Sequence, residues 1–390
     1  MRILFLSRWF PYPINNGSKL RIYNLLHGLS QHHDMSLLSF ADQPEANPEA
    51  PEIREFCSKV KVVPWKEFNP NTLRAHLAML TFTPRSIVDT FSSEMAQAIT
   101  DILNEQRYDL VIASQLQMAA YYPYFQNFPA IFEEFEIGFF HDQAFSKNGK
   151  IRLRQALTWF KLRMYLSQLL DSFQACTVVS EQESQLLIKN FSKFTNPIQV
   201  ISNCLNIDEY NNIKAEKRPN TLIFTGPFKY HANYEAMHWF IREVFPLVLE
   251  RVPDAQLIIT GDHANLPLPL SGKITLTGYV EDVKSLIASS SVSIAPLLSG
   301  GGSRLKILEA MALGIPVVAT LKGAEGLDVT DGEHLLLANS PMEYAECVIN
   351  LLKDENLCLQ LTKKARMLIQ EKYNWGRVLS DYLELIDTIV

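Results

Sequence analysis

Residues 299–320 read SGGGSRLKILEAMALGIPVVAT, and this segment carries the chain's strongest structural signal. The apolar run 292–295 leads into three glycines, and apolar residues at helical spacing follow over 304–313. Gly314 comes just past the last of them, which is typical of a helix end. The apolar run 317–319 then predicts a second buried strand. The segment therefore indicates strand, glycine loop, helix and strand, the repeating unit of a parallel α/β fold.

The glycine loop of this segment predicts a phosphate-binding site. Glycines allow the backbone to approach a ligand closely, and the N-terminus of the following helix adds partial positive charge. Two cations follow the loop directly. The predicted site comprises Gly300, Gly301, Gly302, Ser303, Arg304 and Lys306.

Glu309 lies three residues after Lys306, so the two side chains are expected on one stripe of the helix. A carboxylate beside phosphates is unfavourable unless it reaches past them to a hydroxyl-bearing group such as ribose. The alternative is an ordinary strand-loop-helix with a local Lys306–Glu309 ion pair.

Length and composition favour a two-domain globular protein. The chain has 390 residues, of which 47% are hydrophobic and 20% charged, enough for two cores. Its formal net charge of -6 argues against a general nucleic-acid binder. The five cysteines form no CxxC, and we find no signal peptide or membrane span. These features predict a cytoplasmic protein with reduced thiols.

Strand-like and helix-like segments alternate in both halves, which predicts parallel α/β layers. The expected strands are 3–7, 35–40, 110–113, 130–133, 175–179, 221–225, 256–260, 274–276, 292–295, 317–319 and 335–338. The expected helices are 17–30, 94–106, 151–171, 181–190, 234–251, 283–289, 304–313, 342–354 and 355–372. The polar stretch 203–220 is the expected linker, with little to bury.

Four further stretches accompany the 299–320 segment in a recognisable order. They are MRILFLS at 1–7 with NNGS at 15–18, VISNCLNID at 200–208, LTGYV at 276–280 and KYNW at 372–375. Together they resemble the retaining group 1 (family-four) glycosyltransferases of GT-B architecture. The resemblance implies two Rossmann-like domains facing across a cleft. Residues 1–203 would form an acceptor-side domain with a C-terminal helix, 375–390, packing back on it, and 204–374 the nucleotide-sugar-binding domain.

The resemblance implies a metal-independent hexosyltransferase of polysaccharide or glycolipid synthesis. It would move a sugar, with retention, from a UDP- or GDP-type nucleotide sugar to a saccharide or lipid-linked acceptor. Arg304, Lys306 and Glu309 would be the catalytic residues, the cations stabilising the leaving diphosphate and Glu309 binding ribose. The donor-binding residues would be Gly17, Lys229, Tyr279, Val280, Gly300, Gly301, Gly302 and Ser303. The chain has no DxD motif, so we expect neither a metal nor another cofactor.

The chain departs from the family pattern at two positions. The family places a glutamate eight residues before Glu309, where this chain has Gly301. It also places an arginine soon after the glycine that corresponds to Gly226, and none is present here. Arg304 and Lys306 are interpreted as replacing that clamp. The alternatives are a same-fold epimerase or phosphorylase, and a non-catalytic nucleotide-sugar-binding relative. A dehydrogenase is disfavoured, because the Gly17 loop is not a full GxGxxG.

Two features of the first half concern the acceptor. Glu136 and His141 follow the expected strand 130–133 and are the acceptor-side candidates, the alternative being an exposed acidic loop. Residues 147–163 are basic and amphipathic without an acidic residue, which is typical of peripheral contact with an anionic membrane. The alternative is a solvated helix face packed on its own domain.

Overall fold

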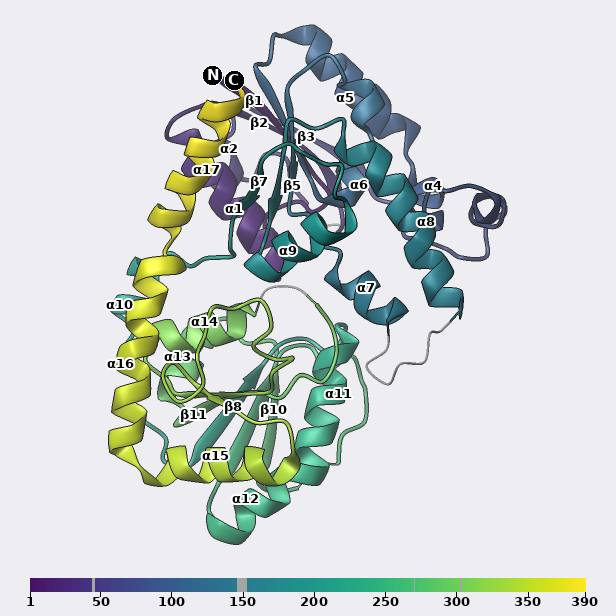
Figure 1. Ribbon diagram of the computed structural model, residues 1–390. Helices are drawn as coiled ribbons and strands as arrows, with labels where there is room; N and C mark the ends of the chain where they lie inside the picture. The colour runs from purple at the N-terminus through teal and green to yellow at the C-terminus, as the bar shows by residue number, and fades with distance from the viewer. Residues whose placement is uncertain (44–45, 146–152, 270, 302–303) are drawn as a thin grey trace. The chain divides into compact units, whose positions relative to one another are not determined.

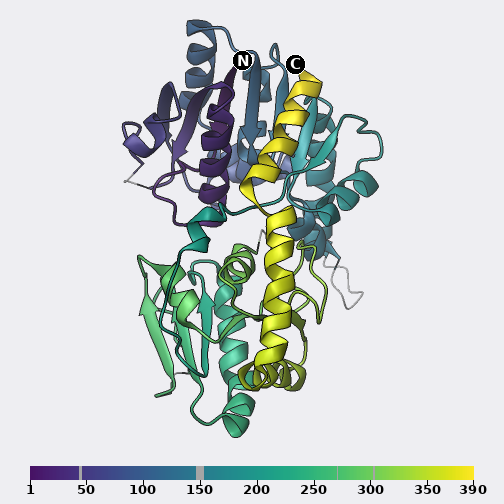
Figure 2. The same cartoon turned by 90° about the vertical axis from the view of Figure 1, so that its left-hand side faces the viewer.

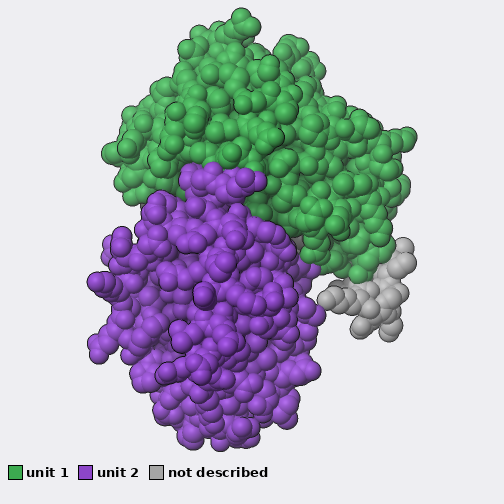
Figure 3. All heavy atoms as spheres, turned by 60° about the vertical axis from the view of Figure 1, so that its left-hand side comes forward, with its two compact units in different colours: residues 1–202, 379–390 green, residues 203–378 purple. Residues whose placement is uncertain are grey.

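The computed structural model describes residues 1–43, 46–145, 153–269, 271–301 and 304–390. These residues form two compact units, coloured separately in Figure 3. Unit 1 comprises Met1–Ser202 and Leu379–Val390, and unit 2 comprises Asn203–Val378. Each unit has its own parallel sheet and its own core, so the chain is α/β throughout.

The sheet of unit 1 has seven parallel strands in the order β3-β2-β1-β4-β5-β6-β7. Their bounds are β1 Arg2–Ser7, β2 Asp34–Ala41, β3 Lys59–Pro64, β4 Leu110–Ser114, β5 Ala130–Glu133, β6 Ala175–Val178 and β7 Ile198–Val200. The central strands are apolar and buried, as strands covered by helices on both faces are. The two edge strands, β3 and β7, were not predicted. β7 is short and half-buried, and β3 carries two lysines that interrupt its apolar run.

Helices cover this sheet, as Figures 1 and 2 show. Their bounds are α1 Gly17–Ser30, α2 Pro51–Arg54, α3 Leu73–Leu77, η1 Ala78–Leu80, α4 Arg85–Thr90, α5 Ser93–Glu105, α6 Gln115–Ala119, η2 Tyr122–Tyr124, α7 Gly138–Ala144, α8 Leu153–Leu170, α9 Glu181–Asn190 and α17 Trp375–Ile389. The side chains of Asn16, Ser92 and Ser180 cap α1, α5 and α9 by accepting backbone N–H bonds. From Leu379 onward α17 belongs to unit 1, where it buries Tyr382 completely.

The sheet of unit 2 has six parallel strands in the order β10-β9-β8-β11-β12-β13. Their bounds are β8 Thr221–Thr225, β9 Gln256–Thr260, β10 Ile274–Gly278, β11 Val292–Ala295, β12 Val317–Ala319 and β13 Leu336–Leu337. Its helices are α10 Asp208–Asn211, α11 His231–Trp239, α12 Phe245–Arg251, α13 Val283–Ser289, α14 Leu305–Ala312, α15 Pro341–Lys353 and α16 Glu355–Lys372. Each strand predicted for this half has a counterpart here within two residues at each end.

Helix α14 ends as its sequence predicts. Gly314 has φ +70°, its N–H donates to Met311 O at 3.0 Å, and Ile315 N–H donates to Ala310 O at 2.8 Å. This pair of hydrogen bonds is the Schellman motif. A residue with a Cβ adopts the positive φ that the motif requires at position 314 only with strain.

Two predictions for unit 2 were wrong in detail. The single helix expected over 234–251 is interrupted by a π-helical turn at Phe240–Val244, just before Pro246, which has no N–H to continue the ladder. The stretch 203–220 is not a bare linker, because Leu205 and Tyr210 are buried and Tyr210 lies on α10. Within the described ranges, none of the helices has the length and apolarity needed to span a bilayer.

Candidate active site

The strand order of unit 2 marks the place where a ligand is expected. The chain reverses its direction of winding between β8 and β11, so the loops after these two neighbouring strands diverge. Ligands of open α/β sheets bind outside the carboxyl ends of the strands at such a switch point. The loop after β8 runs from Gly226 to Tyr230, and the loop after β11 contains the predicted triple glycine.

Bare backbone lies at the carboxyl end of β8. Gly226 has φ +138°, and a Cβ there would lie 2.7 Å from Asn233 Nδ2 and 3.1 Å from Lys306 Nζ. Gly261, which follows β9, has φ +112°, and its Cβ would lie 2.7 Å from the carbonyl carbon of Gly226. At both positions only glycine combines a positive φ with the absence of a Cβ. The result is a backbone surface directly beside the Lys306 ammonium.

Lys306 projects from the first turn of α14 to the end of β8. Its Nζ donates to Asn233 Oδ1 at 2.9 Å and lies 3.9 Å from the centroid of the Phe224 ring. Neither partner carries a negative charge. Burial, assisted by the charge of Arg304 and opposed by that of Glu309, lowers the pKa of Lys306 to about 7. A lysine held in this way gains most from an anion that arrives as a ligand.

Glu309 lies one turn further along α14 and meets a residue of the supposed linker. Tyr210 donates its hydroxyl to Glu309 Oε1 at 3.3 Å. Burial raises the pKa of Glu309, while the Tyr210 bond and the charges of Lys284 and Lys306 lower it. Lys284 also lies 4.5 Å from the Tyr210 ring centroid and bonds Glu209 at 2.6 Å, which fixes the ring beside α14.

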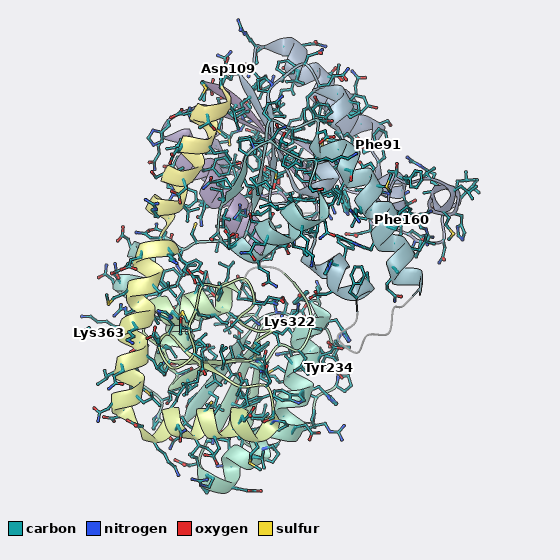
Figure 4. The ribbon with its side chains drawn as sticks, viewed as in Figure 1. Phe91, Asp109, Phe160, Tyr234, Lys322 and Lys363 are labelled. Atoms are coloured by element: carbon teal, nitrogen blue, oxygen red, sulfur yellow. The ribbon has the colours of Figure 1, made fainter. Side chains whose placement is uncertain are left out.

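Arg304 has other partners than the sequence suggested. Its guanidinium is buried and donates to the carbonyls of Gly301 at 3.0 Å, Gly300 at 3.2 Å and Lys322 at 2.9 Å. Figure 4 labels Lys322 in the segment that follows β12. Arg304 therefore ties the glycine loop to that segment and precedes α14 as its N-cap residue. In this arrangement it shapes the loop, whereas Lys306 supplies the cation beside the bare backbone.

Tyr230 positions the glycine loop from the other side. Its hydroxyl donates to Gly301 O at 3.0 Å, and a Cβ at Gly300, where φ is +92°, would lie 2.0 Å from that hydroxyl. Sequence reasoning missed Tyr230, Asn233 and Tyr210. The first two follow Gly226 by four and seven residues, a spacing that signals a loop entering a helix. Nothing in the sequence around Tyr210 signals its contact with Glu309.

The remaining predicted donor residues of unit 2 are less enclosed. Lys229 follows β8 with its side chain exposed, 3.6 Å from Asp262 Oδ2. Tyr279 and Val280 follow β10, and Tyr279 is 79% exposed, so its ring is accessible to a planar ligand. Gly302 and Ser303 lie outside the described residues. The structure thus brings five predicted residues of unit 2 together, namely Gly300, Gly301, Arg304, Lys306 and Glu309. Lys229, Tyr279 and Val280 lie in the loops around this group.

The first strand of unit 1 leads into Gly17, which is the first residue of α1. Two positions on, Lys19 is buried and its Nζ lies 3.0 Å from Asp42 Oδ2. Asp42 follows β2, where a dinucleotide-binding protein carries its ribose-binding acid. Here its carboxylate is engaged by a lysine, which agrees with the argument against a dehydrogenase.

Carboxylates gather at the carboxyl end of β5 in unit 1. Arg21 donates to Glu133 Oε1 at 2.7 Å, and Ser114 donates to Glu133 Oε2 at 2.8 Å. The neighbouring Glu134 accepts a hydrogen bond from Gln115 Nε2 at 2.8 Å. Glu134 and Gln115 both have a positive φ. Burial and the charge of Glu133 hold the pKa of Glu134 well above its usual range. Non-glycine residues at positive φ are concentrated at functional sites.

The two predicted acceptor-side residues differ in their surroundings. Glu136 is half-buried in the turn between β5 and α7, where its charge raises the pKa of Glu134. His141 lies on α7 and its ring packs against Phe145, with centroids 4.8 Å apart, and Trp159, at 5.4 Å. Burial lowers the pKa of His141. These ring contacts join α7 to α8, and a role of His141 toward the acceptor stays a prediction.

No group of three or more histidine, cysteine, aspartate or glutamate side chains suited to a metal occurs among the described residues. Independence of a metal stays a prediction from the sequence.

Comparison with known proteins gives a family match within the second unit. Residues 219–354 match the family of glycosyl transferases group 1. The phosphatidyl-myo-inositol mannosyltransferase of Mycobacterium leprae is 29% identical over 178 residues, which is 43% of this chain and 46% of that protein. The chain matches its leading curated relatives over less than half of their own length.

Solved structures extend the likeness to the whole chain. Sucrose-phosphate synthase from Thermosynechococcus elongatus has a TM-score of 0.71 at 16% identity, covering 100% of this chain and 99% of that one. Anabaena HepE, solved with UDP and glucose, has a TM-score of 0.64 at 15% identity, covering 100% of both chains. At such identities the likeness establishes the fold. Residues 219–354 are therefore a group 1 glycosyltransferase domain, in a chain that has the GT-B glycosyltransferase fold.

Proposed function

We propose that this protein is a retaining glycosyltransferase that moves a hexosyl group from a nucleotide-diphosphate sugar to a saccharide or lipid-linked acceptor. One observation carries the proposal. Lys306 and Glu309, one turn apart on α14, lie at the switch point of a group 1 glycosyltransferase domain, with Lys306 beside the bare backbone of Gly226. A cation followed by a carboxylate matches a diphosphate followed by a ribose.

The diphosphate would bind between the Gly226 backbone and the start of α14. Lys306 there supplies an amine that becomes an ammonium when an anion binds, with no carboxylate partner among its contacts, and the helix N-terminus supplies a partial positive charge. When the sugar–phosphate bond breaks, negative charge grows on the leaving diphosphate. A preorganised hydrogen-bond donor aimed at such charge contributes about 2.7–4 kcal/mol to transition-state stabilisation. These groups would replace a metal, in keeping with the absence of a DxD motif.

Glu309 would accept hydrogen bonds from the ribose hydroxyls. Tyr210 already donates to one of its oxygens, which favours the ionised, accepting form of the carboxylate. Exposed Tyr279, at the end of β10, would contact the base. HepE was solved with UDP and glucose, so UDP is the first nucleotide to test, followed by GDP.

The acceptor would bind at the carboxyl end of β5 in unit 1. Glu134, with its raised pKa, and Glu136 beside it supply groups for acceptor hydroxyls. The Mycobacterium leprae relative is named a phosphatidyl-myo-inositol mannosyltransferase, which supports a lipid-linked acceptor in glycolipid synthesis. The leaving phosphate would take the acceptor proton on the same face, so no protein base is required. The enzyme would act in the cytoplasm, in peripheral contact with a membrane.

A thermal-shift panel tests the donor site. UDP, GDP, ADP and their sugar conjugates are each added to the native chain, to Glu309→Ala and to the control Glu346→Ala, which removes an exposed glutamate from α15. Ligand at a hundred times its dissociation constant adds about 2.7 kcal/mol, enough for a clear rise in Tm. We expect a shift with one base, lost in Glu309→Ala and retained in the control. No shift with any nucleotide would contradict the proposal.

A second candidate, a nucleotide-sugar-binding protein without activity, is favoured by Gly301 in the place of the family glutamate. Transfer and donor-hydrolysis assays with the nucleotide sugar chosen by the panel separate the two. Binding with neither reaction would establish the second candidate. Conversion of the donor without an acceptor would indicate an epimerase or a phosphorylase.

A further inference from the structure

The short helix α3 and the turn η1 that follows it turn their apolar side chains outward. Leu73, Leu77 and Leu80 are spaced four and three residues apart, and they are 74%, 57% and 88% exposed. The buried positions between them are the small residues Ala75 and Ala78. A surface helix normally has the opposite arrangement, with its large apolar side chains in the core. The arrangement places the most hydrophobic part of this segment in contact with the solvent.

Helix α8 has a second apolar stripe on the same unit. Trp159, Leu162 and Leu166 are buried in the core of unit 1. Leu157, Phe160 and Met164, at a spacing of three and four residues, are 56%, 53% and 39% exposed. Figure 4 labels Phe160 on this helix. A helix that is apolar on both sides is expected to be covered on both sides.

The two stripes adjoin. Lys161, between Phe160 and Met164 on the exposed side of α8, donates its Nζ to the carbonyl oxygen of Met79 in η1. Met79 is itself exposed, as is Phe82 immediately after η1. We call the combined surface the apolar face, defined by Leu73, Leu77, Leu80, Leu157, Phe160 and Met164. Several large apolar side chains clustered on one exposed surface mark an interaction site.

The charge of the apolar face points to the kind of partner. The sequence has no aspartate or glutamate between Glu67 and Asp89, and none in α8. Arg74 follows Leu73 in α3, and Lys161 and Arg163 lie in α8, where they donate to the carbonyl oxygens of Met79 and Asn190. The chain as a whole has a net charge of -6, so this surface differs in sign from the molecule that bears it. Outward leucines with interspersed cations and no acid suit the interface of an anionic bilayer.

We propose that the apolar face docks unit 1 on an anionic lipid bilayer. Leu73, Leu77 and Leu80 enter the boundary between headgroups and acyl chains, while Arg74 and Lys161 pair with lipid phosphates. The inference enlarges the membrane contact expected from residues 147–163, because it adds α3 and η1, which the sequence had not marked. It rests on no part of the transfer chemistry. An anionic lipid surface is favoured over a protein partner because the exposed apolar side chains are accompanied by cations, with no acid between Glu67 and Asp89 or in α8.

Vesicle flotation of the full chain tests the proposal. Vesicles of phosphatidylcholine alone are compared with vesicles that also contain phosphatidylglycerol. We expect the native chain to float with the anionic vesicles, and Leu77→Ser/Leu80→Ser to lose about tenfold in bound fraction. Arg74→Glu should lose binding in proportion to its charge and in a salt-dependent way. The matched control is Leu359→Ser/Met367→Ser on α16, where both side chains are similarly exposed.

Because the altered leucines are exposed, Tm and circular dichroism should remain native, and the nucleotide-induced shift in Tm should persist in every variant. That readout separates failure of this proposal from failure of the proposed function. Equal flotation of the native chain and the Leu77/Leu80 variant would overturn the proposal. So would the absence of binding to anionic vesicles together with a concentration-dependent dimer that the same variant abolishes, since the apolar face would then join two copies of this chain.

Discussion

Donor binding should depend on pH through Lys306. Its pKa in the free protein is lowered from 10.5 to about 7, so near neutral pH it is only partly charged. A bound diphosphate favours the ammonium and raises that pKa. The complex then holds more protons than the free protein, and binding is strong at low pH and weakens as the pH rises through about 7.

The size of the effect follows from linkage. If the bound diphosphate restores an ordinary lysine pKa, each pH unit well above the free-state value costs about a tenfold loss of affinity. Between pH 6 and pH 8.5 the dissociation constant should then rise about thirtyfold, or ~2 kcal/mol. Glu309 titrates in the opposite sense, because losing its proton with rising pH improves its acceptor capacity. A net fall in affinity therefore comes from Lys306.

Isothermal titration with UDP-glucose across this pH range measures the dependence, since both phosphates of that ligand are esterified and keep their charge. Lys306→Arg is the decisive control, because a guanidinium stays charged at every pH used. It should bind with little pH dependence, whereas Lys306→Met should bind weakly at all pH values. A dissociation constant that is flat in the native chain, or one that rises equally in Lys306→Arg, would refute the role assigned to Lys306.

Three further outcomes are expected. Gly300→Ala places a Cβ 2.0 Å from the Tyr230 hydroxyl at a backbone φ of +92°. It should destabilise unit 2 by about 1–3 kcal/mol and abolish the nucleotide-induced rise in Tm. The control Gly272→Ala, whose Cβ would have nothing within 4 Å, should leave both quantities unchanged in thermal melts. Arg21→Met leaves the buried Glu133 carboxylate without its cation and should cost about 3–5 kcal/mol in urea unfolding, most of which Arg21→Met/Glu133→Leu recovers. Tyr210→Phe removes the hydroxyl that donates a hydrogen bond to the Glu309 carboxylate. It should weaken UDP binding by about tenfold in titration and leave Tm nearly unchanged. An unaltered affinity would exclude Tyr210 from the site.

The alternation of apolar runs with turn residues was sufficient to predict the central strands of both sheets. Buried parallel strands such as β4 and β8 have an uninterrupted apolar run, LVIA in β4 and LIF in β8, so they are evident without tertiary information. The edge strands β3 and β7 were missed because an edge strand has one hydrogen-bonded neighbour and tolerates lysine or glutamine. The break after Trp239 was missed because the helical spacing of apolar residues continues through a π-turn.

The candidate site could be predicted only where its residues are close in sequence. Lys306 and Glu309 share a helix with the glycine loop, so spacing and the known behaviour of helix termini were enough to single them out. Tyr210 and Asn233 reach α14 from segments 99 and 73 residues away along the chain. A contact of that kind depends on sheet order and helix placement, which a single sequence does not encode in any local pattern.

The role proposed for Lys306 would also give a physical reason for the departure of this chain from the family pattern. A cation in the loop after β8 would lie in solvent, as Lys229 does, where its charge is screened and its side chain is free to move. Lys306 instead reaches the end of β8 from the first turn of a helix, held by Asn233 and the Phe224 ring. Burial there costs stability in the free protein, as the lowered pKa shows, because the charged form lacks an anion. In the proposed site, the same burial would strengthen the interaction with a bound diphosphate relative to that of a screened, exposed lysine, so the cost and the binding energy would have one origin.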